Sequence, residues 1–234
     1  MRLLPLLLSL AAPVGAETLQ ETSLELVLLA DASGSIGPDE LAFQRQGYID
    51  AMTDPQVLAA IADTAYGHIA VTYVEWATNQ AVVVDWILID GPETAAVFGQ
   101  RLAEGPRTAF GRNAIGAALL EAQRLIDTNA YDGFRRVIDF SGDSVNNHSG
   151  PAIAPSRDEV LAAGTTINAL PILHPDDPRR AGFDLEAAYA EQIIGGPGAF
   201  MVTAEGREAF ADAVRRKLFL EISGLTPETD YAQR

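Results

Sequence analysis

Short apolar runs alternate with amphipathic segments along most of the chain. Runs rich in β-branched and aromatic residues predict buried strands, and longer segments with apolar positions three or four residues apart predict helices. Strands are expected at residues 24–30, 68–76, 81–89, 136–140, 165–173 and 199–203. Helices are expected at residues 38–52, 92–103, 113–129, 156–163, 185–194 and 205–222.

The order of these elements predicts an α/β protein. Because strands and helices interleave, the expected fold is a doubly wound, mostly parallel six-stranded sheet with helices on both faces. The strands at 68–76 and 81–89 are separated by a short polar turn, which is typical of a hairpin, so one edge strand should be antiparallel. The sequence shows no internal repeat, and one domain is expected over residues 17–222, followed by a C-terminal tail over residues 223–234.

The first sixteen residues have the pattern of a secretory signal peptide. Arg2 gives a basic start, an apolar run extends from Leu3 to Leu10, and small residues precede a cleavage site after Ala16. The apolar run is much shorter than the ~20 residues that a membrane-spanning helix needs. We therefore expect a periplasmic or secreted protein that has no membrane span.

The amino-acid composition constrains partners and chemistry. Apolar residues make up 48% and charged residues 21% of the 234 residues, which is typical of a globular protein. The formal net charge of −16 argues against nucleic acid or an anionic membrane surface as a partner, because both carry phosphate groups. The chain has no cysteine, which excludes disulfides, thiolate zinc sites and cysteine nucleophiles.

One polar motif lies directly between the first predicted strand and the first predicted helix. Asp31, Ser33 and Ser35 have the spacing Asp-x-Ser-x-Ser. A turn at a strand end can direct all three side chains towards one point, and a carboxylate with two hydroxyls suits Mg²⁺, Mn²⁺ or Ca²⁺ rather than zinc or copper. The alternative is an Asp/Ser turn that caps the following helix. The pentapeptide alone leaves both interpretations open.

A second acidic loop strengthens the metal interpretation. Asp143 follows the strand expected at residues 136–140, within the sequence Ser-Gly-Asp-Ser. In open α/β sheets, ligands bind beyond the carboxyl ends of the strands, where the strand order reverses. If the first strand and the 136–140 strand are neighbours at that point, Asp31 and Asp143 converge. The two carboxylates would then repel each other unless a cation lay between them.

These motifs and their order resemble the von Willebrand factor type A domain. The chain is similar, more narrowly, to a bacterial group of exported, largely uncharacterised A-domain-like proteins. Asp31-x-Ser33-x-Ser35 is the most specific mark of this resemblance. The further marks are Val74–Ala77, Arg136–Asp139 and Ser141–Asp143. The resemblance covers roughly residues 23–222, which is nearly the whole expected mature chain.

The resemblance implies a metal-ion-dependent adhesion site. It assigns Asp31, Ser33 and Ser35 as ligands from the first loop and Asp143 as the acidic ligand after the fourth strand. The expected ion is Mg²⁺, with Mn²⁺ or Ca²⁺ as alternatives. Water fills the remaining coordination positions, and an Asp or Glu of a protein partner can displace one water. The resemblance therefore predicts a binding protein for an unknown protein partner.

The family also uses a threonine ligand, and here the chain departs from the pattern. Counting back six residues from the helix residue Leu119 gives Asn113 instead of threonine. An asparagine can donate its carbonyl oxygen, and its longer side chain would shift the metal or add a water. Thr108 is the alternative if its loop folds back, but the spacing favours Asn113.

Two loops are expected at the rim of this site. The loop after the fourth expected strand and the segment 174–180 after the fifth each suit either partner contact or a solvent-exposed connection. Their candidate contact residues are Asn146, Asn147, His148, Asp176 and Asp177. Within the 136–140 strand, Asp139 needs a buried partner, which we expect to be Arg135 or Arg136.

Two other functions compete with metal-dependent protein binding. A periplasmic metal-binding or small-ligand-binding protein would use the same oxygen site. A serine hydrolase is the second alternative, because Gly142-Asp143-Ser144 resembles a block of one serine esterase family. Ser144 lies in mid-chain, however, and a triad would have to recruit His148 or His174 from unfamiliar positions. The chain has no Gly-x-Ser-x-Gly, Walker or His-Glu-x-x-His motif, so we do not expect an enzyme.

Overall fold

The computed structural model describes residues 18–175, 177–178 and 182–227 of the chain. The predicted signal peptide (1–16), most of the predicted tail (228–234) and the candidate rim residue Asp176 lie outside the described residues. Within the described ranges, no helix combines the length and the apolar character that crossing a bilayer requires.

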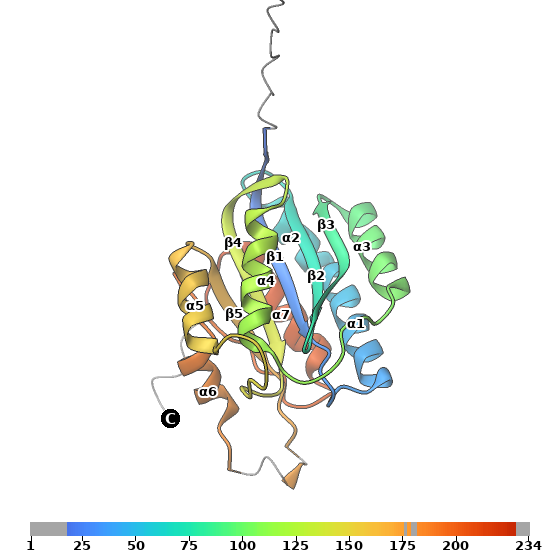
Figure 1. The fold of residues 1–234 in the computed structure, drawn as a ribbon. Coiled ribbons are helices and arrows are strands. Elements are labelled where there is room, and N and C mark those ends of the chain that lie inside the picture. The colour runs from blue at the N-terminus through green and yellow to red at the C-terminus, as the bar shows by residue number, and fades with distance from the viewer. Residues whose placement is uncertain (1–17, 176, 179–181, 228–234) are drawn as a thin grey trace, which may run out of the picture.

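A five-stranded mixed sheet lies at the centre of the molecule, in the order β3-β2-β1-β4-β5 (Figure 1). The strands are β1 (Gln20–Asp31), β2 (Ile69–Trp76), β3 (Gln80–Ile89), β4 (Tyr131–Gly142) and β5 (Thr166–Pro171). All neighbouring pairs are parallel except β2 and β3, which form the antiparallel hairpin at one edge. This arrangement confirms the predicted α/β class and the antiparallel edge strand.

The prediction of a sixth strand at residues 199–203 is wrong. This segment follows the free edge of β5, but it forms only two isolated parallel bridges, Ala169 with Met201 and Ile172 with Ala204. The chain reaches the edge through a turn in which Gly196 and Gly198 have positive φ. Ala169 donates to the Phe200 carbonyl and Ala204 donates to the Pro171 carbonyl, but Pro171 has no N–H to donate between them, so the ladder is interrupted.

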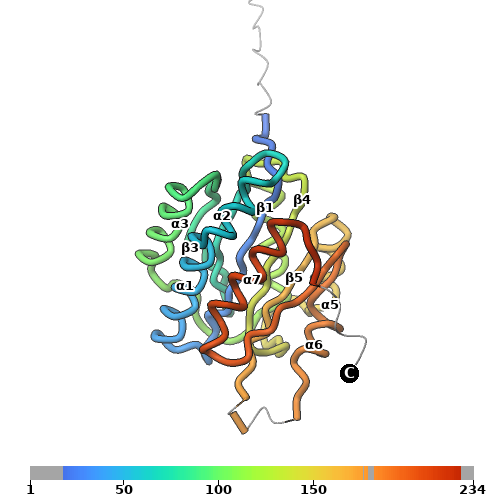
Figure 2. The backbone as a smooth tube through the Cα atoms, turned by 180° about the vertical axis from the view of Figure 1, so that it is seen from behind, coloured from blue at the N-terminus to red at the C-terminus, as the bar shows by residue number. Residues whose placement is uncertain are grey.

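Helices cover both faces of the sheet (Figures 1 and 2). One face carries α4 (Ile115–Asp127), α5 (Ile153–Ala162) and α6 (Leu185–Gln192). The other carries α1 (Pro38–Met52), α2 (Pro55–Ala62), α3 (Pro92–Glu104) and α7 (Phe210–Ser223). The sequence analysis missed α2, although its start has two ordinary signals. Asp54 accepts a hydrogen bond from the Gln56 N–H, and Pro55 occupies the first helical position.

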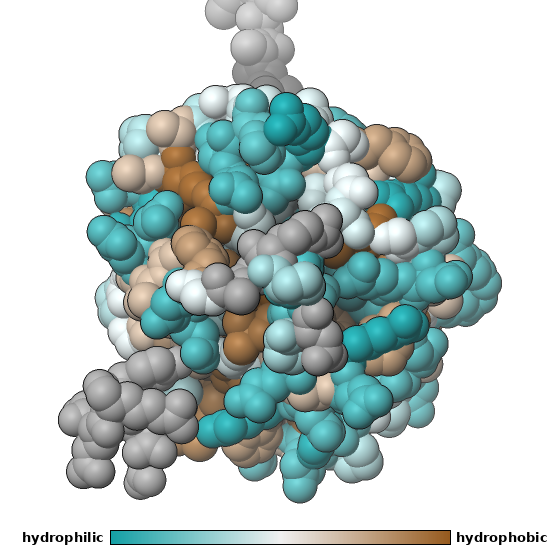
Figure 3. All heavy atoms as spheres, turned by 90° about the horizontal axis from the view of Figure 1, so that it is seen from below, coloured by the Kyte–Doolittle hydropathy of each residue, from teal (hydrophilic) through white to brown (hydrophobic). Residues whose placement is uncertain are grey.

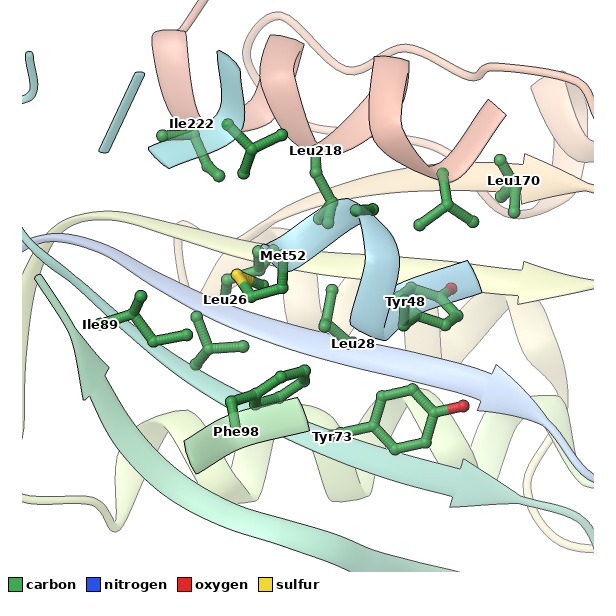
Figure 4. Close-up of a cluster of buried hydrophobic side chains, with 14 of the residues drawn as sticks. Leu26, Leu28, Tyr48, Met52, Tyr73, Ile89, Phe98, Leu170, Leu218 and Ile222 are labelled. Carbon is green, nitrogen blue, oxygen red and sulfur yellow. The ribbon is translucent and has the colours of Figure 1, made fainter. Parts of the chain in front are cut away.

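β1 is the central strand, and its side chains divide between two cores. Leu26 and Leu28 point towards α1 and α7, where they pack near Tyr48 (Figure 4). Val27 and Leu29 point to the opposite face and pack beneath α4. Both faces of the strand are therefore buried, which explains why its sequence is a continuous apolar run.

A group of buried charges joins α7 to the sheet. Lys217, the only lysine in the chain, is fully buried. Its Nζ lies 2.6 Å from Asp139 Oδ1 and also contacts the Glu221 carboxylate. Asn168 of β5 donates to Glu221 Oε1 at 3.0 Å. Burial and then the Asp139 carboxylate raise the pKa of Glu221 to about 8, against the opposing effect of Lys217.

The partner expected for Asp139 is therefore wrong. Arg135 donates instead to the carbonyl oxygens of Glu221 and Ile222 at the end of α7, both at 2.7 Å. Arg136 lies 3.6 Å from Glu25 on β1. The two arginines sit near the start of β4, whereas Asp139 is further along the strand and faces α7. The spacing of residues along β4 does not indicate that Lys217, on α7, is the partner of Asp139.

Candidate metal centre

Asp31 and Asp143 lie at the same end of the sheet. Asp31 is the last residue of β1, and Asp143 follows β4 directly. The two strands are hydrogen-bonded neighbours, with Ala30 paired to Ser141. From β1 the chain passes to β2 on one side, while β4 lies on the other, so the strand order reverses here. Open α/β sheets bind ligands at such a point, which is at the lower end of the molecule in Figure 1.

The Asp-x-Ser-x-Ser segment forms a tight turn at this point. Asp31 is fully buried, and its Oδ1 accepts a hydrogen bond from the Ser33 N–H at 2.8 Å. Ser33 is also buried, and its Oγ lies 3.3 Å from the Oγ of the exposed Ser35. The turn therefore brings one carboxylate and two hydroxyls into one small region.

The electrostatics of Asp31 indicate a place for a cation. Burial, and next the nearby Asp143 carboxylate, raise the pKa of Asp31 to about 7, whereas hydrogen bonds from Ser33 and from the backbone of Asp143 lower it. Asp31 Oδ2 is buried and has no partner of normal hydrogen-bond geometry among the described residues. Two neighbouring carboxylates, one with an unsatisfied oxygen, fit a divalent cation as their counter-charge.

Gly142 permits the close approach of β4 to Asp31. A Cβ at this position would lie 3.0 Å from Trp76 Cζ2, 3.0 Å from the Tyr189 hydroxyl and 3.3 Å from Asp31 Oδ2. The first two distances are shorter than ordinary carbon contacts. The residue before Asp143 must therefore be small for the two strand ends to meet in this way.

The donor set suits a hard ion. No group of three or more His, Asp or Glu side chains is placed to hold a metal in the part of the chain that the structure describes. A cation between Asp31 and Asp143 would therefore need serine oxygens or water. Carboxylates, hydroxyls and water are the ligands that Mg²⁺, Mn²⁺ and Ca²⁺ prefer.

Asn113 and Thr108, the two candidates for the missing threonine, have different surroundings. Asn113 is half-buried, and its carbonyl accepts from the His148 N–H at 2.8 Å, which joins its loop to the loop after β4. Thr108 is exposed, and its carbonyl accepts from the Asn79 side chain in the β2–β3 turn. Both contacts are made by backbone carbonyls: that of Asn113 with the loop that begins at Asp143, and that of Thr108 with the hairpin turn. The role of Asn113 as a ligand stays a prediction.

The rim residues have different surroundings. Asn146 and Asp177 line a cavity of about 600 Å³ next to the site, together with Ser35 and Asp143. Figure 3 views this end of the molecule, where hydrophobic side chains show between hydrophilic ones. His148 is exposed on the same loop.

Asn147 has a structural role that the sequence did not suggest. Its Oδ1 accepts from the Gly116 N–H at 3.3 Å, and its Nδ2 donates to the Pro151 carbonyl at 2.8 Å. Because Ala114 cannot cap α4 with its side chain, Asn147 supplies a partner for a backbone N–H in the first turn. It thereby fixes the loop after β4 against α4.

Ser144 has contacts that stabilise the loop. Its Oγ accepts from the Asn146 N–H at 2.9 Å, and its carbonyl accepts from the Tyr189 hydroxyl at 3.4 Å. No histidine hydrogen-bonds to this hydroxyl among the described residues.

Arg107 is a residue at the site that the sequence analysis missed. Its guanidinium donates to the carbonyls of Ala32 at 2.7 Å and Ile36 at 3.0 Å, and also to that of Ser33 at 3.4 Å. It therefore holds the backbone of the Asp-x-Ser-x-Ser turn from the loop that follows α3. Nothing in the local sequence marks these contacts, because they join segments more than seventy residues apart.

Truncation of Arg107 should loosen this turn. We expect Arg107→Ala to destabilise the protein by about 1–3 kcal/mol, because buried carbonyls lose a charged donor, and to weaken divalent-cation binding by about tenfold or more. Urea unfolding and calorimetric titration with Mg²⁺ measure the two effects. Arg112→Ala is the matched control, because Arg112 is exposed in the same loop. Equal effects of the two variants would contradict this positioning role.

His174 is the second residue that was not predicted as part of the site. It follows β5, and its Nε2 lies 3.4 Å from Asp143 Oδ2. The sequence indicated that the loop from residue 174 emerges at this end of the sheet. The contact itself joins two strand ends, so spacing along the chain does not reveal it.

The chain belongs to a family described as a protein of unknown function, DUF1194, whose model matches residues 21–226. No curated protein matches the chain in sequence. The sequence comparisons therefore establish the family, and solved structures provide the further likeness.

Solved structures with a similar fold include three proteins from different sources. The pilus adhesin SpaC from Lactobacillus rhamnosus GG has a TM-score of 0.61 and 12% identity, over 87% of this chain and 31% of that chain. A von Willebrand factor type A protein from Catenulispora acidiphila has a TM-score of 0.59 and 14% identity, over 86% and 43% of the two chains. Proximal thread matrix protein 1 from the mussel byssus, with a zinc-occupied MIDAS motif, has a TM-score of 0.56 and 17% identity, over 84% and 46%.

These likenesses confirm the von Willebrand factor type A fold that the sequence resemblance predicted. The chain spans less than half the length of each of these three proteins. At these identities the likeness concerns the fold, and not the partners of the other proteins.

Proposed function

We propose that this chain is an exported, metal-dependent protein-binding module. Asp31, Ser33, Ser35 and Asp143 hold a divalent cation, with Asn113 as a further ligand. The observation that carries the proposal is the buried, unsatisfied Oδ2 of Asp31 beside Asp143 at the reversal of strand order. The fold also occurs in a pilus adhesin and in a protein with a zinc-occupied MIDAS motif, which supports the same class of function.

The site residues supply two kinds of ligand to the cation. The two carboxylates supply negative charge, and the serine hydroxyls supply neutral oxygens, so the protein leaves part of the shell of a hard cation to water. When bound, the cation supplies a Lewis-acidic position that a carboxylate can occupy. The partner group is therefore an Asp or Glu side chain. The chain uses this site for binding and not for catalysis.

The surroundings of the site support a protein partner. The cavity beside Ser35 and Asp143 has both polar and apolar lining residues, including Val145, Phe183 and Leu185. Phe183 is 58% exposed, so an apolar side chain is accessible close to the charged site. The net charge of −16 disfavours an acidic partner at long range, but screening by salt limits this effect beyond ~10 Å.

Thermal unfolding of residues 17–234 in EDTA, Mg²⁺, Mn²⁺ and Ca²⁺ tests the site. An ion at ~100 times its dissociation constant should stabilise the protein by ~2.7 kcal/mol, or roughly 5–10 °C for a domain of this size. Asp143→Ala should abolish the shift. Proteins of the exported fraction should then be retained on immobilised chain with Mg²⁺ but not with EDTA. No shift with any ion, or an unchanged shift in the variant, would show that the metal assignment is wrong.

A further inference from the structure

The buried charges between α7 and the sheet place an amine against a carboxyl group. Lys217 Nζ lies 2.6 Å from Asp139 Oδ1, and neither side chain is more than 2% exposed. Within the described ranges, Asp139 Oδ1 nevertheless makes no hydrogen bond of normal angles. The Glu221 carboxylate contacts the same amine from the next turn of α7. A nucleophile, an electrophile and a proton carrier therefore meet at a site that is shielded from water.

We propose that Lys217 and Asp139 form an intramolecular amide cross-link that joins α7 to β4. The Lys217 nitrogen bonds to the carboxyl carbon of Asp139, and one carboxyl oxygen leaves as water. Because the reactants are an ammonium and a carboxylate, two protons pass from the nitrogen to the leaving oxygen, and the product is neutral. The reaction needs no oxidant, reductant or other co-reactant. This inference goes beyond the proposed function and does not depend on a bound cation.

Burial favours this reaction in two ways. The fold holds the two groups in contact, which replaces an encounter between separate molecules. The amide also removes two charges from a buried site, where charges are costly to keep. Before the bond forms, Lys217 and Asp139 are the buried ion pair between α7 and β4.

Glu221 is placed to carry the protons. Burial and then the Asp139 carboxylate raise the pKa of Glu221 to about 8. A carboxyl group whose pKa is near the ambient pH both accepts and donates a proton readily. Glu221 and Asn168 also line a cavity of about 530 Å³, through which the released water can leave.

Asn168 is the other side chain of the cluster that could be attacked, and its contacts argue against it. Its Nδ2 donates to Glu221 Oε1, and its Oδ1 accepts from the Phe200 N–H, both at 3.0 Å. The amide of Asn168 is therefore satisfied, whereas Asp139 Oδ1 is not. The bond is assigned to Asp139 for this reason.

The cross-link would fasten α7 to the strand that leads to Asp143. The chain has no cysteine, so a disulfide cannot serve this purpose. Lys217 is also the only lysine. A modified ε-amine can therefore be assigned to this residue without ambiguity.

Tryptic digestion and mass spectrometry of residues 17–234 test the inference. Trypsin cuts after a free lysine, whereas an amide at Lys217 Nζ blocks that cut. The wild type should yield residues 137–157 joined to residues 217–234, and the intact chain should be lighter than its sequence by the mass of one water. Lys217→Arg keeps the positive charge but has no amine to react, so it should have the full mass.

Two further variants test the proton carrier. Glu221→Gln should leave most of the chain unlinked, because a carboxyl group that transfers protons accelerates such a step by about a hundredfold or more. Glu208→Gln is the matched control, because Glu208 is exposed just before α7, and this variant should link like the wild type.

Each outcome decides one part of the inference. A wild type of full mass that trypsin cuts after Lys217 would overturn it, even if a variant fails to fold. A link from Lys217 to residues 158–179, with loss of ammonia instead of water, would place the bond at Asn168 and refute the role of Asp139. Normal linkage in Glu221→Gln would refute the role of Glu221. None of these results changes the metal titration, so the proposed function stands or fails separately.

Discussion

Asp31→Asn should make the metal-free protein more stable at neutral and alkaline pH, and should remove its response to metal. Burial and the Asp143 carboxylate raise the pKa of Asp31 from its ordinary value of 3.8 to about 7. Ionisation of Asp31 is therefore less favourable in the folded chain than in the unfolded chain. The difference in pKa corresponds to at most about 4 kcal/mol, which a neutral asparagine avoids.

The direction with pH follows from the raised pKa. Below about pH 4 the carboxyl is protonated in both states, so wild type and variant should differ little. Between pH 4 and 7 the folded wild type binds more protons than the unfolded chain, and its stability falls as the pH rises. The relative loss should be complete above about pH 7. A saturating cation should reverse it in the wild type, because the cation favours the ionised carboxylate, and should not affect the variant.

Urea unfolding in EDTA and in Mg²⁺, from pH 4 to pH 8, measures this difference. The raised pKa values of Glu25 and Glu221 also make stability fall with pH, but they are common to both proteins and cancel in the comparison. Asp158→Asn is the control, because its side chain is 73% exposed. If the free energies of unfolding of the wild type and of Asp31→Asn ran parallel with pH in EDTA, ionisation of Asp31 would not destabilise the folded chain, and the prediction would be wrong.

Local features were sufficient to predict the central strands and the two acidic loops. The run from Leu24 to Ala30 is apolar throughout because β1 is covered on both faces. Convergence of Asp31 and Asp143 was expected only if their two strands were neighbours, and the pairing of β1 with β4 meets that condition.

The missed features depend on contacts between distant segments. Residues 199–203 follow β5, but they form only isolated bridges because Pro171 of β5 has no N–H to donate. In the sequence, Arg107 has no feature that distinguishes it from other loop arginines. Its role follows only from the position of its loop beside the Asp-x-Ser-x-Ser turn. His174 likewise has no local mark, since its relation to Asp143 follows from the neighbouring positions of β4 and β5.

Lys217→Met should destabilise the protein by about 3–5 kcal/mol, because it leaves the Asp139 and Glu221 carboxylates buried without their cation. For a domain of this size, the melting temperature should fall by roughly 10 °C or more. The loss should be larger at pH 8 than at pH 5, since Glu221, whose pKa is already raised to about 8, takes up a proton more readily at the lower pH. Urea unfolding at the two pH values measures both effects.

Two comparisons separate the loss of this ion pair from the loss of charge in general. Arg216→Met removes one positive charge from an exposed position of the same helix and should change stability by less than about 0.5 kcal/mol. Adding Asp139→Asn and Glu221→Gln to Lys217→Met removes the stranded charges and should recover a large part of the loss. A loss below about 1 kcal/mol in Lys217→Met would mean that Asp139 and Glu221 take up protons in the variant at little cost in free energy. The buried charges would then contribute little to holding α7 against β4.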